Sequence, residues 1–339
     1  MDATAGRDIY FSFFMFTADL RPDDTRYTRV LVDHLKAITE MGYDGFDVHI
    51  ASAPPTVDHK LEVESYVRLK KAFDDAGLAD VKFSTNVGST RTFDPTSPYK
   101  EQRDQALSYL KSRVDITWVL GGESIMSGPF LYPYGAFALT DFGDPIWSDA
   151  LQDWLQPRYL AARPVLQELA EYASTKGVKL AIEPVKNWEI PGPNTVSEVL
   201  DFLDGVESTQ CGVLIDTAQV VMESQGPSIF RNNVARAAEQ GRLNSVHISA
   251  PDRGAVHDSW ILWDAILGEI DPVYSGPYLV EVFNAVPPFD ASMRMTRRRF
   301  WRPGEDEPGA DGQSAYDIAR IALETVQEQL ASLRGGPST

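Results

Sequence analysis

The sequence contains a single cysteine, Cys211, among its 339 residues. One thiol cannot form a disulfide within the chain, nor can it supply the thiolate ligands of a structural zinc cluster. Long apolar runs are also lacking, since none approaches the roughly 18 residues of a membrane-spanning helix. The first residues, Met1 to Asp8, do not place a basic region before an apolar core, so we expect no signal peptide. These absences predict a cytoplasmic protein with no membrane partner.

Basic residues are outnumbered, with 31 lysines and arginines against 49 aspartates and glutamates, for a formal net charge of −18. Nucleic acids and anionic membranes both require a basic face, so neither is expected as a partner. A basic cluster from Arg294 to Arg302 is followed by Glu305, Asp306 and Glu307, which favours local ion pairing. Because 43% of the residues are hydrophobic, the chain can build a sizeable core, and we expect a soluble enzyme.

Apolar segments of strand length alternate with segments of helical periodicity along the chain. The expected strands are residues 9–16, 45–50, 81–87, 116–120, 178–183, 211–216, 245–248 and 277–282. The expected helices are residues 25–41, 60–76, 99–112, 159–176, 196–203, 228–239, 263–267 and 315–333. Strict alternation predicts a parallel sheet, and eight units predict closure. We therefore predict an α/β fold, a (β/α)8 TIM barrel, as a single domain over residues 1–339 with its core at about 8–335.

Two stretches interrupt this alternation. From Glu123 to about Leu155 the sequence is rich in glycine, proline and aromatic residues, and from Phe283 to Gln313 it is again irregular. The first stretch would follow strand four and the second strand eight. Both long loops are therefore expected over the C-terminal mouth of the barrel, where the loops of such barrels carry function. Ser314 and Asp317 then form a capping-box-like start for the last helix.

Four apolar strands end in a residue that can bind a metal. The ends of expected strands five to eight carry Glu183, Asp216, His247 and Glu281, spaced 33, 31 and 34 residues apart. This spacing is close to one βαβ unit of roughly 30 residues. Any one of them could simply begin a loop and cap the next helix, but four in successive units favour a shared site at the barrel mouth. Three carboxylates and one imidazole suit Mn²⁺, Mg²⁺ or Co²⁺ better than a structural zinc ion.

The segments around these residues resemble those of a known family. The segment from Glu183 to Glu189 resembles the strand-five motif of the xylose-isomerase-like TIM barrels, and that from His247 to Arg253 resembles their strand-seven motif. The segments from Asp258 to Asp264 and from Glu281 to Phe283 are similar as well. Within this superfamily of sugar isomerases and epimerases, the chain is most similar to the ketose 3-epimerases that act on tagatose and allulose. The likeness covers Ile9 to about Phe283.

This resemblance implies a site and a reaction. It implies a divalent metal, with Mn²⁺ expected first and Co²⁺ or Mg²⁺ as alternatives, held by Glu183, Asp216, His247 and Glu281. Glu183 and Glu281 would also be catalytic and exchange a proton with the carbon beside the carbonyl of a keto sugar, by way of a metal-bound enediolate. The residues implied in substrate binding are Glu189, Arg253, Gln219 and Phe283. A homo-oligomer, either a dimer or a tetramer, is implied as well.

One position departs from the family pattern, because Gln219 stands where a histidine is expected after the strand-six aspartate. Glutamine forms hydrogen bonds but carries no charge. Together with the long loops, it leaves room for an alternative: a lyase subunit of the C-glycoside deglycosidase type that acts on 3-keto-glycosides with a small partner subunit. A non-catalytic sugar-binding barrel is a further alternative. A barrel-type endonuclease is disfavoured, because it needs a basic face and more histidines than the five present.

Overall fold

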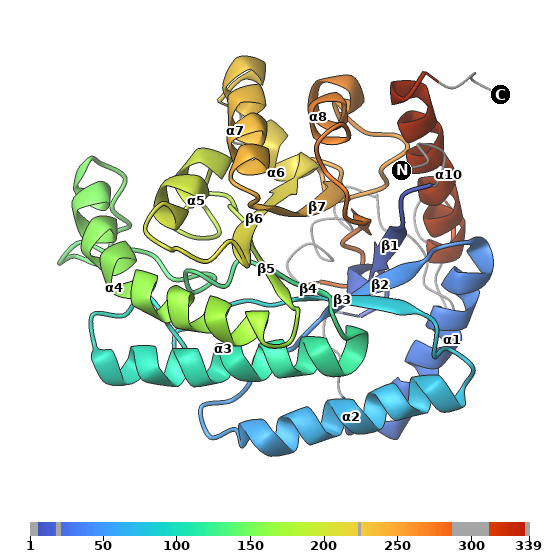
Figure 1. The fold of residues 1–339 in the computed structure, drawn as a ribbon, viewed down its shortest axis with the longest axis horizontal. Coiled ribbons are helices and arrows are strands. Elements are labelled where there is room, and N and C mark those ends of the chain that lie inside the picture. The colour runs from blue at the N-terminus through green and yellow to red at the C-terminus, as the bar shows by residue number, and fades with distance from the viewer. Residues whose placement is uncertain (1–5, 18–21, 223–224, 287–311, 336–339) are drawn as a thin grey trace.

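The computed structural model describes residues 6–17, 22–222, 225–286 and 312–335. Eight parallel strands follow one another in chain order and close into a barrel, because β8 pairs with β1. The strands are β1 Ile9–Ser12, β2 Gly45–His49, β3 Lys82–Asn86, β4 Ile125–Gly128, β5 Lys179–Ile182, β6 Cys211–Asp216, β7 Leu243–Ser249 and β8 Tyr278–Glu281. The predicted (β/α)8 barrel is therefore confirmed (Figure 1).

Helices surround the barrel and connect its strands (Figure 1). They are α1 Thr25–Met41, α2 His59–Asp75, α3 Lys100–Gly121, α4 Ala150–Ser174, α5 Val196–Leu203, α6 Thr217–Met222, α7 Pro227–Glu239, α8 Trp263–Ile270 and α10 Ala315–Leu333, with a short 3-10 turn, η1 Phe13–Met15, after β1. Side chains cap several of these helices. Asp24 and Asp58 accept backbone N–H bonds at the starts of α1 and α2, and the predicted capping box of Ser314 and Asp317 begins α10.

Apolar side chains fill both faces of the barrel strands. Because side chains alternate between the two faces of a strand, Leu180 and Ile182 of β5 pack outward in the main core while Ala181 points into the barrel. Ala181 packs there with Ile125 of β4 and Leu214 of β6 in a small separate cluster. Two residues further along these strands, at the next positions that point into the barrel, the side chains are polar. The candidate site begins at that level of the barrel.

The prediction of strand four at residues 116–120 is wrong. These residues form the end of α3, and β4 is Ile125–Gly128. Ile116 and Leu120 are buried while Trp118 is 48% exposed, which is the pattern of a helix with one face in solvent. A short apolar run does not by itself distinguish a strand from a helix that packs on a core. β4 has the sequence IMSG, so its own apolar signal is weak.

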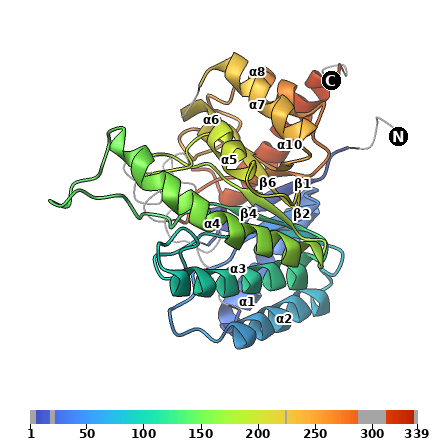
Figure 2. The same cartoon turned by 60° about the vertical axis from the view of Figure 1, so that its left-hand side comes forward.

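A long segment connects β4 to α4. Residues 129–149 are all described, and within them the structure shows no helix or regular strand but an isolated bridge between Leu139 and Pro145. In Figure 2 this green segment projects beside the start of α4. α4 begins at Ala150, earlier than the predicted Tyr159.

The second predicted loop, after strand eight, falls largely outside the described residues, as does the basic cluster from Arg294 to Arg302. Within the described ranges, no helix combines the length and the apolar character needed to cross a membrane.

Candidate active site

The C-terminal ends of β5 to β8 carry the predicted metal ligands. Glu183 follows β5 directly, Asp216 ends β6, His247 lies in β7 and Glu281 ends β8. The strand register places Asp216 beside His247, and Ser249 beside Glu281. Because the strands are parallel, these groups meet at the same mouth of the barrel.

A cavity of about 230 Å³ is present at this mouth. Its wall includes six predicted site residues, which are Glu183, Glu189, Gln219, Arg253, Glu281 and Phe283. Two further predicted residues, Asp216 and His247, are buried and are not part of this wall. The structure therefore brings the predicted catalytic and substrate-binding residues together around a single space.

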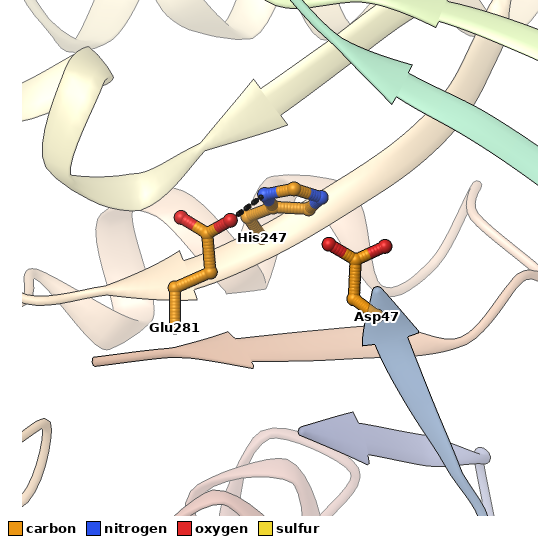
Figure 3. A group of neighbouring side chains, drawn as sticks. All are labelled: Asp47, His247 and Glu281. Carbon is orange, nitrogen blue, oxygen red and sulfur yellow. Dashed lines mark ion pairs between the residues drawn. The ribbon is translucent and has the colours of Figure 1, made fainter. Parts of the chain in front are cut away.

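His247 lies between two carboxylates (Figure 3). Its Nδ1 is 2.9 Å from Oε1 of Glu281, and one ring nitrogen, one oxygen of Glu281 and one oxygen of Asp47 all lie within 4.8 Å of one another. The three side chains are buried. Asp47 was not predicted as a site residue. Its signal in the sequence is an acidic residue between Phe46 and Val48, at an inward position of an otherwise buried strand.

Asp216 makes a different set of contacts. Its Oδ2 is 3.1 Å from Nη1 of Arg253, and its Oδ1 accepts hydrogen bonds from Oγ of Ser249 and from the backbone N–H groups of Ala218 and Gln219. Asp216 thus begins α6, a helix that was not predicted. Burial would raise the pKa of Asp216, but Arg253 and then His247 outweigh it and hold that pKa below its ordinary value. Asp216 and Glu183 are not in the group within 4.8 Å around His247.

Arg253 connects the end of β7 to the end of β8. Its guanidinium lies 3.9 Å from Oε1 of Glu189 and 4.9 Å from the ring centre of Phe283, and its carbonyl accepts a hydrogen bond from the Phe283 N–H. Its backbone is left-handed, with φ of 62°, which costs a non-glycine residue about 1–2 kcal/mol. Such strain persists where the surrounding contacts fix the residue. Arg253 is therefore held rigidly in the cavity wall.

Comparison with known proteins decides the family. The family model described as Xylose isomerase-like TIM barrel matches residues 35–299. The chain belongs to this family. A solved structure from Anabaena variabilis, provisionally assigned as a sugar phosphate isomerase/epimerase, is 52% identical with a TM-score of 0.92, covering 97% of this chain and 100% of the other.

Two curated relatives of this xylose isomerase-like barrel are named as epimerases. The "Probable ketose 3-epimerase" of Synechocystis sp. is 24% identical over 290 residues, which is 84% of this chain and 88% of the relative. The "L-ribulose 3-epimerase" of Methylomonas sp. is 31% identical over 149 residues, 42% of this chain, and the match spans half (50%) of that relative's length. The resemblance to ketose 3-epimerases seen in the motifs is confirmed.

Acidic side chains dominate the buried part of this xylose isomerase-like site. Burial, together with the charges of Glu281 and Asp216, raises the pKa of Glu183 well above its ordinary value. Burial alone would lower the pKa of His247, but the nearby carboxylates of Glu281 and Asp47 outweigh it and raise this pKa to about 10. Excess negative charge of this kind is stabilised by protons or by a bound cation.

The residues present fit a divalent cation. Among the described residues, the buried Oδ2 of Asp47 accepts no hydrogen bond, whereas Oε1 of Glu281 lies 2.9 Å from Nδ1 of His247. Buried polar atoms without a partner are rare in folded proteins and call for an explanation such as an ion. Carboxylate oxygens with one imidazole nitrogen are suitable ligands for Mn²⁺, Mg²⁺ or Co²⁺.

The loop between β4 and α4 contributes to the cavity. Tyr134 of this loop lies in the cavity wall, and the next backbone N–H, that of Gly135, donates a 2.8 Å hydrogen bond to the carbonyl of Glu189. Burial, and after it the charge of Glu189, raises the pKa of Tyr134 to about 12. The expectation that this loop covers the mouth is thus supported at Tyr134, although nothing in the sequence distinguished Tyr134 from the other aromatic residues of the loop.

Proposed function

We propose that the protein is a divalent-metal-dependent sugar epimerase or isomerase of the ketose 3-epimerase type. The observation that carries this proposal is that Glu183 and Glu281 line one cavity from β5 and β8, with the imidazole of His247 beside Glu281. The named epimerases among the relatives support it. A carboxylate pair at one substrate is the arrangement needed to remove a proton on one face of a carbon and return a proton on the other.

The proposed metal ligands are Glu183, Asp216, His247 and Glu281, with Mn²⁺ expected first. When bound, a divalent ion would polarise the sugar carbonyl and lower the energy of negative charge that develops on its oxygen. Arg253 and Ser249 fix the orientation of Asp216 and lower its pKa, so Asp216 would be an ionised ligand.

The chain's own carboxyl groups would move the proton. One of Glu183 and Glu281 accepts the proton from the carbon beside the carbonyl, which leaves an enediolate. The other gives a proton to the opposite face and so inverts the configuration.

The remaining wall residues would hold the sugar. Glu189 and Gln219 offer hydrogen-bonding groups to its hydroxyls, and Arg253 offers a planar fork of donors. Phe283 stacks on Phe14, with ring centres 4.8 Å apart, so that the two rings form an apolar wall for the C–H face of the substrate.

An epimerisation assay tests this function. Purified protein loaded with Mn²⁺ is incubated with free ketoses, and the products are separated by chromatography. We expect the 3-epimer of at least one ketose, and we expect EDTA to abolish its formation and Mn²⁺ to restore it. If every free ketose is returned unchanged while a 3-keto-glucoside is cleaved, the lyase alternative replaces this proposal. Sedimentation of the same sample tests the predicted homo-oligomer.

A further inference from the structure

The cavity wall continues past the proposed catalytic pair, over strands on the other side of the barrel. Glu183 and Glu281 lie at the ends of β5 and β8, so a sugar carbon between them has β6 and β7 on one side and β1 to β4 on the other. Gln219 and Arg253, which follow β6 and β7, occupy the first side. The proposed function leaves the polar residues of the second side without a role.

Two polar residues reach the cavity from this second side. His49 ends β2 and Asn86 ends β3, and the strand register places them beside each other. Both lie in the cavity wall. In the closed barrel, β2 and β3 lie across from β6 and β7 (Figure 1). His49 and Asn86 therefore lie across the cavity from Gln219 and Arg253.

The side chain of Asn86 is buried in this wall. It is only 6% exposed, and its amide forms no hydrogen bond within the part of the chain that the structure describes. Gly128 of β4 makes room for this amide, because a Cβ at Gly128 would lie 3.0 Å from Oδ1 of Asn86. Burying an amide without a partner is costly, so its place in the cavity wall points to a polar group of a ligand.

Aromatic contacts fix the place of His49. Its ring centre lies 5.1 Å from that of Phe14, which in turn stacks on Phe283. An imidazole can both donate and accept a hydrogen bond. Among the described wall residues that come from β1 to β4 and the loops after them, none is a carboxylate, a lysine or an arginine. This side of the cavity is thus suited to hydroxyl groups, whereas a phosphate would call for a cationic partner.

We propose that His49 and Asn86 determine substrate specificity by binding hydroxyl groups on the part of the ketose beyond carbon 3. This inference rests on the proposed function, because it takes carbon 3 as the reacting carbon between Glu183 and Glu281. The proposed metal ligands of β6 and β7 would hold the carbonyl end of the sugar on their side of the barrel. Carbons 4 to 6, with their hydroxyls, would then extend over the ends of β2 and β3.

Deoxy analogues test the proposal in the wild-type protein, so this measurement does not depend on the folding of any variant. Values of kcat/KM are measured with Mn²⁺-loaded protein for the preferred ketohexose and for its 4-deoxy, 5-deoxy and 6-deoxy analogues. A site built to hydrogen-bond a hydroxyl rejects an analogue that lacks it. We expect at least one analogue to lose about fivefold or more in kcat/KM. Equal values for the parent and all three analogues would overturn the proposal.

Variants then assign the lost contact to a residue. In His49→Ala or Asn86→Ala, the parent ketose should lose about fivefold in kcat/KM, and the further loss on removing the matching hydroxyl should shrink to less than about twofold. Asn232→Ala is the matched control, because Asn232 is an exposed asparagine of α7 outside the cavity wall and should discriminate as the wild type does. Mn²⁺ affinity should be unchanged in all three variants.

Discrimination that persists in full in both His49→Ala and Asn86→Ala would overturn the assignment. A higher kcat/KM for the 6-phosphate of the same ketose would overturn it too, because this side of the cavity would then bind an anion. Wild-type protein that epimerises no ketose would instead contradict the proposed function, and this inference with it.

Discussion

At the scale of single residues, the site is an arrangement of buried charges that neutralise one another incompletely. Arg253 pairs with Asp216 and approaches Glu189, and His247 lies between Glu281 and Asp47. Each of these groups is costly to bury alone and is tolerated because its neighbours compensate it. Removing one member should therefore affect both stability and binding.

Arg253→Ala should destabilise the fold by about 3–5 kcal/mol, since it leaves the buried Asp216 without its cation. Urea denaturation of the metal-free protein measures this change. Arg320→Ala is the control, because Arg320 forms an exposed pair with Glu324 within α10 and should cost less than about 1 kcal/mol. Equal effects of the two substitutions would show that the Arg253 pair is not a stabilising contact.

Metal binding should release protons at neutral pH. In the metal-free protein Glu281 and Asp47 raise the pKa of His247 to about 10, so His247 holds a proton at pH 7 that a bound metal must displace. Mn²⁺ affinity should accordingly rise with pH between 6 and 8, within the range below the pKa of His247. Calorimetry in buffers of different ionisation enthalpy counts the protons. Affinity that is independent of both pH and buffer would contradict this charge assignment.

At the scale of elements, the sequence predicts the bounds of a helix or strand well where the spacing of its apolar residues is clear. The ranges of β6, α5 and α10 agree with the prediction because an uninterrupted apolar strand or a strong apolar face identifies each of them. The prediction of strand four fails at the end of α3, because ITWVL has the composition of a strand but packs on one face only. α6 follows the ligand candidate Asp216 directly and, with six residues, is too short for its periodicity to be recognised.

The loop between β4 and α4 should act on substrate binding. Tyr134→Phe removes a hydroxyl from the cavity wall near Glu189, and the loss of one hydrogen bond of about 1 kcal/mol predicts a roughly fivefold higher KM with unchanged kcat. Steady-state kinetics on the preferred ketose measure both constants. Tyr99→Phe, an exposed residue before α3, serves as the control. A fall in kcat at constant KM would instead make Tyr134 part of the proton transfer.

At the scale of the whole molecule, the barrel explains why part of the site was visible in the sequence. Glu183, Asp216, His247 and Glu281 each end or nearly end an apolar strand, and a parallel barrel must bring such ends together. The proximity of Asp47 to His247 was not predictable, because it brings β2 and β7 together across the interior and depends on side-chain direction. The ion pair of Asp216 with Arg253 likewise arises from a turn with a left-handed residue.

Bound metal should stabilise the entire fold. A ligand that binds only the folded chain adds about 2.7 kcal/mol at a concentration 100 times its Kd. Thermal unfolding should therefore shift upward with Mn²⁺, and Glu281→Gln should lose most of that shift. A shift of equal size in this variant would place the stabilising ion elsewhere.

The proposed chemistry is that Glu183 and Glu281 exchange a proton with the carbon beside a sugar carbonyl. Its most direct test is to incubate Mn²⁺-loaded protein with its ketose in deuterated water and to follow carbon 3 by NMR. Deuterium is expected to enter at carbon 3 as the epimer forms, and Glu281→Gln is expected to lower this exchange by at least about 100-fold. Epimer that forms without deuterium at carbon 3, or full exchange in the variant, would contradict it.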